Sequence, residues 1–172
     1  QERSDYNMSV GQSQLASGQL YYNAQYPIND VTSVYSFGGF SHRNGKSYAF
    51  NRLPNGSGTF TQVSANGFLP EIESAIVDAS AAVGVTTQLF GFDTDISSNL
   101  GSNSFKYDVN NSINATLGTN SPSSFYAGKV SFLQSTTNLD LTKKFDVLAG
   151  LNVAFGGEFR YENYQIKSGE EA

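Results

Sequence analysis

The longest regular pattern in the chain lies near its C-terminal end. From Val147 to Tyr161 every odd-numbered residue is apolar or glycine, whereas the even-numbered set runs into Glu158, Arg160 and Glu162. Alternation of this kind predicts a β-strand with two different faces. At about 3.3 Å per residue the run would measure roughly 50 Å, whereas strands of soluble domains usually end after about 5 or 6 residues. A membrane-spanning strand needs about 9 to 11 residues and has one lipid-facing side, so the pattern favours such a strand.

The composition favours β-structure and argues against several classes of function. Of 172 residues, 38% are hydrophobic and 15% are charged, with ten Tyr, thirteen Phe and no Cys. Much of the remainder is Ser, Asn, Thr, Gln and Gly, which disfavour helices and suit strands joined by turns. The net charge of -5 and the pI near 4.7 argue against nucleic acid as a partner, because phosphate binding relies on clustered Lys and Arg. No apolar run reaches the roughly 18 residues of a transmembrane helix, so a membrane role would have to use strands.

The two ends of the sequence suggest a segment of a longer protein. The chain begins with Gln rather than Met, and its last residues, GEEA, are charged. Bacterial outer-membrane barrels commonly end on a strand with a terminal aromatic residue, which this C-terminus does not supply. Residues 1–17 show no lasting period, and we expect them to form an irregular arm.

Period-two patterns and turn signals predict about six strands in an antiparallel arrangement. The expected strands cover 19–28, 31–42, 83–92, 92–100, 125–141 and 147–166, and the alternation over 105–117 could extend one of them. Short connections are expected at 29–30, near 91 and at 144–146, and long ones at 43–82 and 101–126. Short and long connections therefore alternate, as in outer-membrane barrels with short periplasmic turns and long extracellular loops. The expected fold is an all-β, antiparallel membrane β-barrel segment.

Several motifs resemble the barrel of TonB-dependent receptors in order and spacing. They are NGFLPEI at 66–72, SINATLG at 112–118, SPSSFYAG at 121–128, NLDLTKKFDV at 138–147 and LNVAFGGEFRYENYQIKSGEEA at 151–172. The likeness covers about residues 20–172, so we expect residues 18–172 to be a partial receptor barrel. It implies a 22-stranded outer-membrane barrel, plugged by an N-terminal domain, that takes up a metal chelate, a vitamin or a glycan. Neither the plug nor its energy-coupling box is visible in this sequence.

The resemblance also implies partners and a location. A barrel segment would contact outer-membrane lipid, the remainder of the barrel and the plug, and it would reach an inner-membrane energy-coupling protein only through that plug. The expected location is the bacterial outer membrane. A slice of about six strands must leave unpaired edges, so the isolated chain is expected to misfold, oligomerise or close in a non-native way.

Candidate ligand-binding residues lie in the long connection expected at 43–82. They are Arg43, Arg52, Glu71 and Asp78, since recognition residues commonly lie on loops held by a rigid scaffold. For any one of them, solubility of the loop and internal pairing is the simpler explanation. Phe68 and Leu69 are expected to be buried, with Pro70 fixing a bend that folds the loop back.

A second group of charged residues is expected to face the barrel lumen. Glu158, Arg160 and Glu162 share the even face of the last strand, and two carboxylates beside a base could suggest acid and base catalysis. No nucleophile or His accompanies them, so we expect no enzymatic activity and no cofactor. The single histidine, His42, is expected to face solvent, and no metal site is expected.

The aromatic residues are interpreted as girdles at the two membrane interfaces. This set comprises Tyr21, Tyr22, Tyr26, Tyr35, Phe37, Phe40 and Tyr161.

Two other interpretations of the whole chain stay open. One is a self-contained outer-membrane barrel of eight or more strands, an adhesin or structural protein with extra hairpins at 43–45 and 118–124. The other is a secreted carbohydrate-binding β-sandwich.

Overall fold

A computed structural model describes residues 13–54, 56, 62–147 and 149–170 of the chain. The described residues form one antiparallel sheet of six strands in sequential order, so the all-β, six-stranded prediction is confirmed. The strands are β1 (Gln14–Pro27), β2 (Ser33–Tyr48), β3 (Glu71–Leu89), β4 (Phe92–Asn110), β5 (Ser124–Phe145) and β6 (Leu151–Ser168). Each is far longer than the usual strand of a soluble domain.

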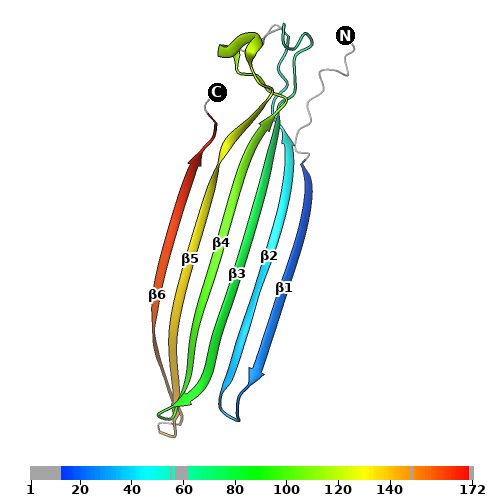
Figure 1. The fold of residues 1–172 in the computed structure, drawn as a ribbon. Helices are drawn as coiled ribbons and strands as arrows, with labels where there is room; N and C mark the ends of the chain where they lie inside the picture. Colours follow the sequence, from blue (N-terminus) through cyan, green and yellow to red (C-terminus); the bar gives the residue numbers. More distant parts are fainter. Residues whose placement is uncertain (1–12, 55, 57–61, 148, 171–172) are drawn as a thin grey trace.

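The sheet is elongated and gently curved, with all short connections at one end and all long ones at the other (Figure 1). The turn end carries the connections 28–32, 90–91 and 146–150. The loop end carries the connections 49–70 and 111–123, the second of which contains the 3-10 helix η2 (Ala115–Asn120). The predicted alternation of short and long connections is therefore confirmed.

The strands extend well beyond their predicted bounds on the first half of the sheet. β1 begins at Gln14, so the arm prediction is wrong for Gln14–Ser17, while residues 1–12 lie outside the described part. β2 continues through Arg43–Gly45, where a turn was predicted, because β1 and β3 both pair with this stretch. Pairing on both sides outweighs the local turn preference of Asn and Gly. β3 begins at Glu71, so the loop is 49–70 rather than 43–82.

The last turn also differs from its prediction. Lys144 and Phe145 belong to β5, although 144–146 was expected to be a tight turn. The carbonyl of Val147 accepts hydrogen bonds from the backbone N–H groups of Gly150 and Leu151, at 2.9 and 3.0 Å. Ala149 and Gly150 both have positive φ, of 64° and 108°, which is turn backbone rather than strand backbone. The alternating strand therefore begins at Leu151 and not at Val147.

The two alternative folds need elements that the described residues do not form. Residues 43–45 lie inside β2, and residues 118–124 comprise the end of η2, a short connection and the first residue of β5, so neither makes a hairpin. The described residues form a single sheet, whereas a β-sandwich requires two. The sheet is not closed, because β1 and β6 each pair with only one neighbouring strand.

The strand register sorts the side chains onto two faces. Directly paired residues share a face, so Asp78 of β3 lies with Ser41 of β2 and Asn103 of β4, while Ala79 lies with Phe40 and Ser102. We call the first the polar face; it carries the odd residues of β1, β2 and β4 and the even residues of β3, β5 and β6. The second is the apolar face. Among described residues the only buried hydrophobic one is Ala82, so no conventional core exists.

Candidate functional site

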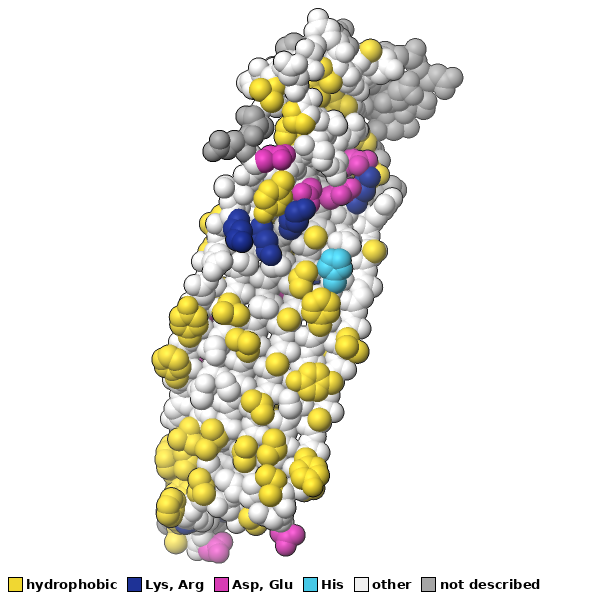
Figure 2. Space-filling model, viewed as in Figure 1, with side chains coloured by type: hydrophobic (Ala, Val, Ile, Leu, Met, Phe, Trp, Pro, Cys, Tyr) yellow, Lys and Arg dark blue, Asp and Glu magenta, His cyan; other side chains and the backbone are white. Residues whose placement is uncertain are grey.

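The apolar face carries a broad zone of hydrophobic side chains with small polar residues among them, which we call the apolar band. It comprises Leu20, Tyr22, Ala24, Tyr26, Val34, Phe40, Ala79, Ala81, Val83, Val85, Leu89, Phe92, Ile96, Leu100, Leu133, Leu139, Leu141, Leu151, Val153, Phe155, Phe159 and Tyr161. Figure 2 shows this face, with hydrophobic groups spread from the turn end over most of its length. Their exposure is high, reaching 73% for Leu20 and 72% for Phe159.

Small polar residues lie between the members of the apolar band, and some hydroxyls are satisfied internally. Ser36 donates a hydrogen bond to the carbonyl of Ala82 at 2.8 Å, and its hydroxyl also lies 3.0 Å from that of Tyr22. Thr94 is buried and donates to the carbonyl of Phe92 at 3.2 Å. Hydroxyls that bond to protein in this way are tolerated in an apolar environment, because their desolvation is compensated.

Charged residues border the apolar band on its loop side (Figure 2). Lys46 lies 2.6 Å from a carboxylate oxygen of Glu71 and 3.9 Å from one of Glu73, and Lys106 lies 2.8 Å from Asp108. These groups are outside the apolar band. The hydrogen bond from Lys46 to Glu71 raises the pKa of Lys46, so this lysine stays charged.

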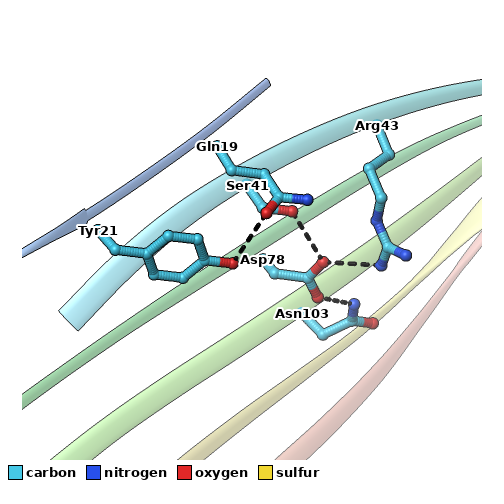
Figure 3. A network of polar contacts seen from close by, with 6 residues as sticks. All are labelled: Gln19, Tyr21, Ser41, Arg43, Asp78 and Asn103. Atoms are coloured by element: carbon cyan, nitrogen blue, oxygen red, sulfur yellow. Dashed lines mark hydrogen bonds and ion pairs between the residues drawn. The ribbon is translucent and has the colours of Figure 1, made fainter. Parts of the chain in front are cut away.

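The polar face carries a cluster centred on the carboxylate of Asp78 (Figure 3). One oxygen, Oδ2, accepts hydrogen bonds from Arg43 Nη2 at 2.9 Å and from Ser41 Oγ at 3.5 Å. The other, Oδ1, accepts a short hydrogen bond from the side-chain amide of Asn103. Three adjacent strands thus contribute to one carboxylate. Nε of Arg43 is buried and has no hydrogen-bond partner among the described residues.

A hollow of about 440 Å³ lies beside Asp78, lined mainly by polar-face residues of five strands. Tyr21, Phe37 and Phe132 supply aromatic walls, and Asn99, Asn103, Gln134 and Asp78 supply hydrogen-bonding groups. Gly101 leaves the floor open, because a Cβ there would have no neighbour within 4 Å, whereas the ring of Tyr21 packs against Gly39. Aromatic surfaces beside amides and a carboxylate can contact an uncharged or cationic polar molecule or a protein segment.

The three predicted lumen residues form a charge ladder on the polar face of β6. Arg160 lies 2.9 Å from a carboxylate oxygen of Glu158 and 3.9 Å from one of Glu162. Arg160 pairs with Thr136 and Glu162 with Gln134, and both of these β5 residues line the hollow. The three residues therefore share one polar face, as predicted, and the ladder borders the hollow on its β5 side.

The four predicted ligand residues do not gather in one loop. Arg43 and Asp78 lie within β2 and β3 and contact each other across the sheet, so their loop assignment is wrong. Glu71 is the first residue of β3 and lies on the apolar face with Lys46. Arg52 alone is in the loop 49–70, where its backbone pairs with Phe68. Phe68 and Leu69 are half-buried, and Pro70 is buried.

Two members of the polar cluster, Ser41 and Asn103, were not singled out from sequence. The sequence alone indicates that Ser41 and Arg43 share a face, because they are two residues apart on one strand. The contacts of Ser41, Arg43 and Asn103 with Asp78 depend on the register between strands, because these partners are 25 to 37 residues apart along the chain. Alternation within one strand carries no information on that register.

The aromatic residues divide between the two faces, which partly corrects the girdle prediction. Tyr22, Tyr26, Phe40 and Tyr161 belong to the apolar band. Tyr21, Tyr35 and Phe37 lie on the polar face instead. The rings of Tyr35 and Phe37 are parallel, with centroids 6.3 Å apart, and Tyr35 donates to Asp95 at 2.9 Å.

The described part of the chain contains neither a cluster of metal ligands nor a helical membrane span. Within the described ranges, no three His, Cys, Asp or Glu side chains gather in a way that could hold a metal ion. His42 is exposed on the apolar face, opposite Val77. None of the described helices has the length and hydrophobicity needed to cross a membrane.

Comparisons with known proteins identified no relative of this chain. No family model, curated protein or solved structure matches this chain. The function proposed below is therefore inferred from the residues and from their arrangement.

Proposed function

We propose that this chain is a wall segment of a TonB-dependent receptor in the bacterial outer membrane. In this proposal the apolar band faces lipid, the polar face lines the lumen, and the loop end is extracellular. The whole receptor would take up a scarce nutrient such as a metal chelate, a vitamin or a glycan, without enzymatic activity. The observation that carries the proposal is that the described residues form a sheet with an exposed apolar face and no conventional core.

The missing core supports a lipid environment for the apolar face. A sheet in water must bury its hydrophobic face against another layer, and Ala82 is the one buried hydrophobic residue among those described. The apolar band has members on all six strands, whereas the exposed apolar patches of soluble monomers are usually confined to a few hundred Å². Acyl chains would cover it without a second protein layer.

The dimensions of the apolar band fit a bilayer. On β3 we end the band at Ala79, because the next residue on this face, Val77, pairs with the polar residues His42 and Ser104. From Ala79 to Leu89 the band covers ten residue steps, or roughly 33 Å along the strand at about 3.3 Å per step. A tilt of about 40° would reduce its height to roughly 25 Å, which is the usual height of the apolar zone in outer-membrane barrels.

The free edges support a place within a larger barrel. Because six antiparallel strands alternate in direction, β1 and β6 run oppositely and each could pair antiparallel with a further strand. Unpaired backbone groups are costly in lipid, so a membrane sheet must pair its edges. The remainder of the receptor barrel would supply those strands. The motif resemblance over residues 20–172 gives the proposal its receptor family.

The polar face would serve the lumen and its contents. The Asp78 cluster and the adjoining hollow lie on the wall that would face the plug or a passing nutrient. Arg43 and Asp78 would then act from the lumen wall rather than from an extracellular loop, while Arg52 remains a loop candidate. The energy-coupling protein of the inner membrane would contact the plug and not this segment.

Insertion into lipid tests the membrane part of the proposal. The full chain, diluted from urea into phosphatidylcholine vesicles, is expected to gain β-structure with strands tilted about 35–45° by polarised infrared spectroscopy. Association of copies is expected as well, because the edges of β1 and β6 need partners. A detergent-free, monomeric and cooperatively melting protein in water would contradict the proposal.

The receptor part has a separate test in the gene. The reading frame is expected to continue upstream into a plug domain and downstream through further strands to a terminal aromatic residue. A frame that encodes only about six strands would contradict the receptor assignment, whereas the lipid-facing role of the apolar band would be unaffected.

A further inference from the structure

Three lysines lie side by side on the apolar face, next to the loop side of the apolar band. The register pairs Lys106 of β4 directly with Lys129 of β5, and Lys129 directly with Lys167 of β6. Directly paired side chains have Cβ atoms about 4.5–5.5 Å apart, so the three lysine side chains leave the sheet in one row. We call Lys106, Lys129 and Lys167 the lysine row. Basic side chains gather on this side of the apolar band in Figure 2.

The lysine row is only partly neutralised by protein. Lys106 lies 2.8 Å from Asp108, and its ammonium group is 5.3 Å from the ring centre of Tyr126. Among the residues that the structure describes, Lys129 and Lys167 form no ion pair. The nearby carboxylate of Glu170 is a hydrogen-bond acceptor for the backbone N–H of Tyr126. Three lysines beside the carboxylates of Asp108 and Glu170 leave this region with a charge of about +1.

This arrangement is costly for the protein alone. Like charges directly opposite on neighbouring strands destabilise a sheet, and the lysine row contains two such pairs. The chain as a whole is acidic, with a net charge of -5, so the row does not follow from general basicity. The lysine row holds three of the ten Lys and Arg residues. An anion bridging Lys129 and Lys167 would remove the repulsion.

The position of the lysine row relative to the apolar band indicates which class of anion fits it. On β5, Lys129 lies four residues beyond Leu133, the last member of the apolar band on that strand. Four residues measure roughly 13 Å along the strand, or about 10 Å in height at a tilt of about 40°. Between them lie Ser131 and, on the neighbouring strands, Ser104 and Gln165. The order is therefore apolar, polar and then cationic, which matches the acyl chains, the interfacial zone and the charged headgroup of a lipid.

We propose that the lysine row binds the phosphate headgroup of an anionic lipid in the loop-side leaflet, with the acyl chains of that lipid on the apolar band. This inference rests on the proposed lipid-facing role of the apolar face. Each lysine near an anionic headgroup contributes enough to raise lipid affinity about five-fold. Because Lys106 is paired with Asp108, Lys129 and Lys167 supply most of the preference, about 25-fold for the two.

The chain contains no tryptophan, so Tyr161→Trp would introduce a single reporter on the apolar face, on the same strand and face as Lys167. The full-length reporter chain is refolded in phosphatidylcholine vesicles that contain a brominated lipid, and quenching of the indole by bromine measures lipid contact. Brominated phosphatidylglycerol and brominated phosphatidylcholine are compared. The anionic lipid is expected to associate about 25-fold more strongly, and Lys129→Gln with Lys167→Gln is expected to abolish this preference.

A matched control removes the same kind of charge elsewhere. Lys144→Gln lies on the polar face near the turn end and is expected to leave the preference unchanged. Equal quenching by the two lipids, or equal effects of the control and the double variant, would overturn the lipid site while leaving the lipid-facing role intact. Absence of quenching by brominated phosphatidylcholine would instead overturn that role. Full competition by free inorganic phosphate would also refute a lipid site, since it would show that the acyl chains add nothing.

Discussion

An arginine placed on the apolar band should cost far more than an arginine on the polar face of the same strand. Val83 and Ser80 are both exposed residues of β3, three positions apart, and their side chains leave the sheet on opposite faces. We therefore compare Val83→Arg with Ser80→Arg. A third variant, Val77→Arg, places the same residue on the apolar face but beyond the loop-side end of the apolar band.

The magnitude follows from the depth of Val83. It lies four residues from Ala79 and six from Leu89, or roughly 13 and 20 Å along the strand at about 3.3 Å per residue. Tilted by about 40°, these distances place Val83 near the middle of an apolar zone about 25 Å high. An arginine at the midplane of a barrel wall costs about 2–4 kcal/mol, and one near the interface about 0–1 kcal/mol. The midplane cost of about 2–4 kcal/mol corresponds to about a 30- to 900-fold fall in the ratio of folded to unfolded chains.

The assay is a urea titration of the full chain in phosphatidylcholine vesicles, followed by tyrosine fluorescence and by far-UV circular dichroism. The free energy of unfolding is expected to fall by about 2–4 kcal/mol for Val83→Arg and by less than about 1 kcal/mol for Ser80→Arg and Val77→Arg. The free energy of unfolding should depend on urea concentration with the same slope in the unsubstituted chain and in the three variants, because each exposes a similar surface on unfolding.

Two results would refute the reasoning. If Val83→Arg and Ser80→Arg cost the same, the two faces would not differ in environment, and the apolar band would not contact lipid. If Val83→Arg and Val77→Arg cost the same, the environment would not depend on depth, as it must across a bilayer.

Two further predictions concern the polar face. A Cβ on Gly84 would lie 2.2 Å from the ring of Tyr35, whereas one on Gly101 would have no neighbour within 4 Å. In the same vesicle titration Gly84→Ala should therefore cost about 1–3 kcal/mol by overpacking, and Gly101→Ala should cost nothing measurable; equal costs would contradict the observed packing. Arg43 and Asp78 are 40% and 38% exposed, so Arg43→Gln should cost less than about 1 kcal/mol. That loss should disappear at 1 M salt, and a loss that persists there would show that charge is not its cause.

Much of the fold could be predicted because its signals are local. Alternation in Leu151–Tyr161 gives a two-faced strand regardless of its neighbours, and Gly91 marks the short turn between β3 and β4. The predictions failed where neighbouring strands outweighed local preference. Arg43–Gly45 resembles a turn in isolation, yet its backbone groups pair with β1 and β3 and continue the strand.

The candidate site could be predicted only in part. Glu158, Arg160 and Glu162 were correctly predicted to share a face, because residues two apart on one strand do so, while their position in a lumen stays a prediction. The Arg43–Asp78 contact was missed, since both residues were expected in a loop. The lysine row was missed as well, because its members lie on three strands and each looks unremarkable alone.

The sequence by itself determined the strand class, the number of strands and the alternation of short and long connections. These features depend on period-two patterns and on turn residues, which act over a few neighbouring positions. Only the tertiary structure decided which residues meet across strands, and hence the Asp78 cluster, the hollow and the lysine row. The physical reason is that register is fixed by backbone pairing between segments far apart in the chain, and a shift of one residue would exchange the two faces.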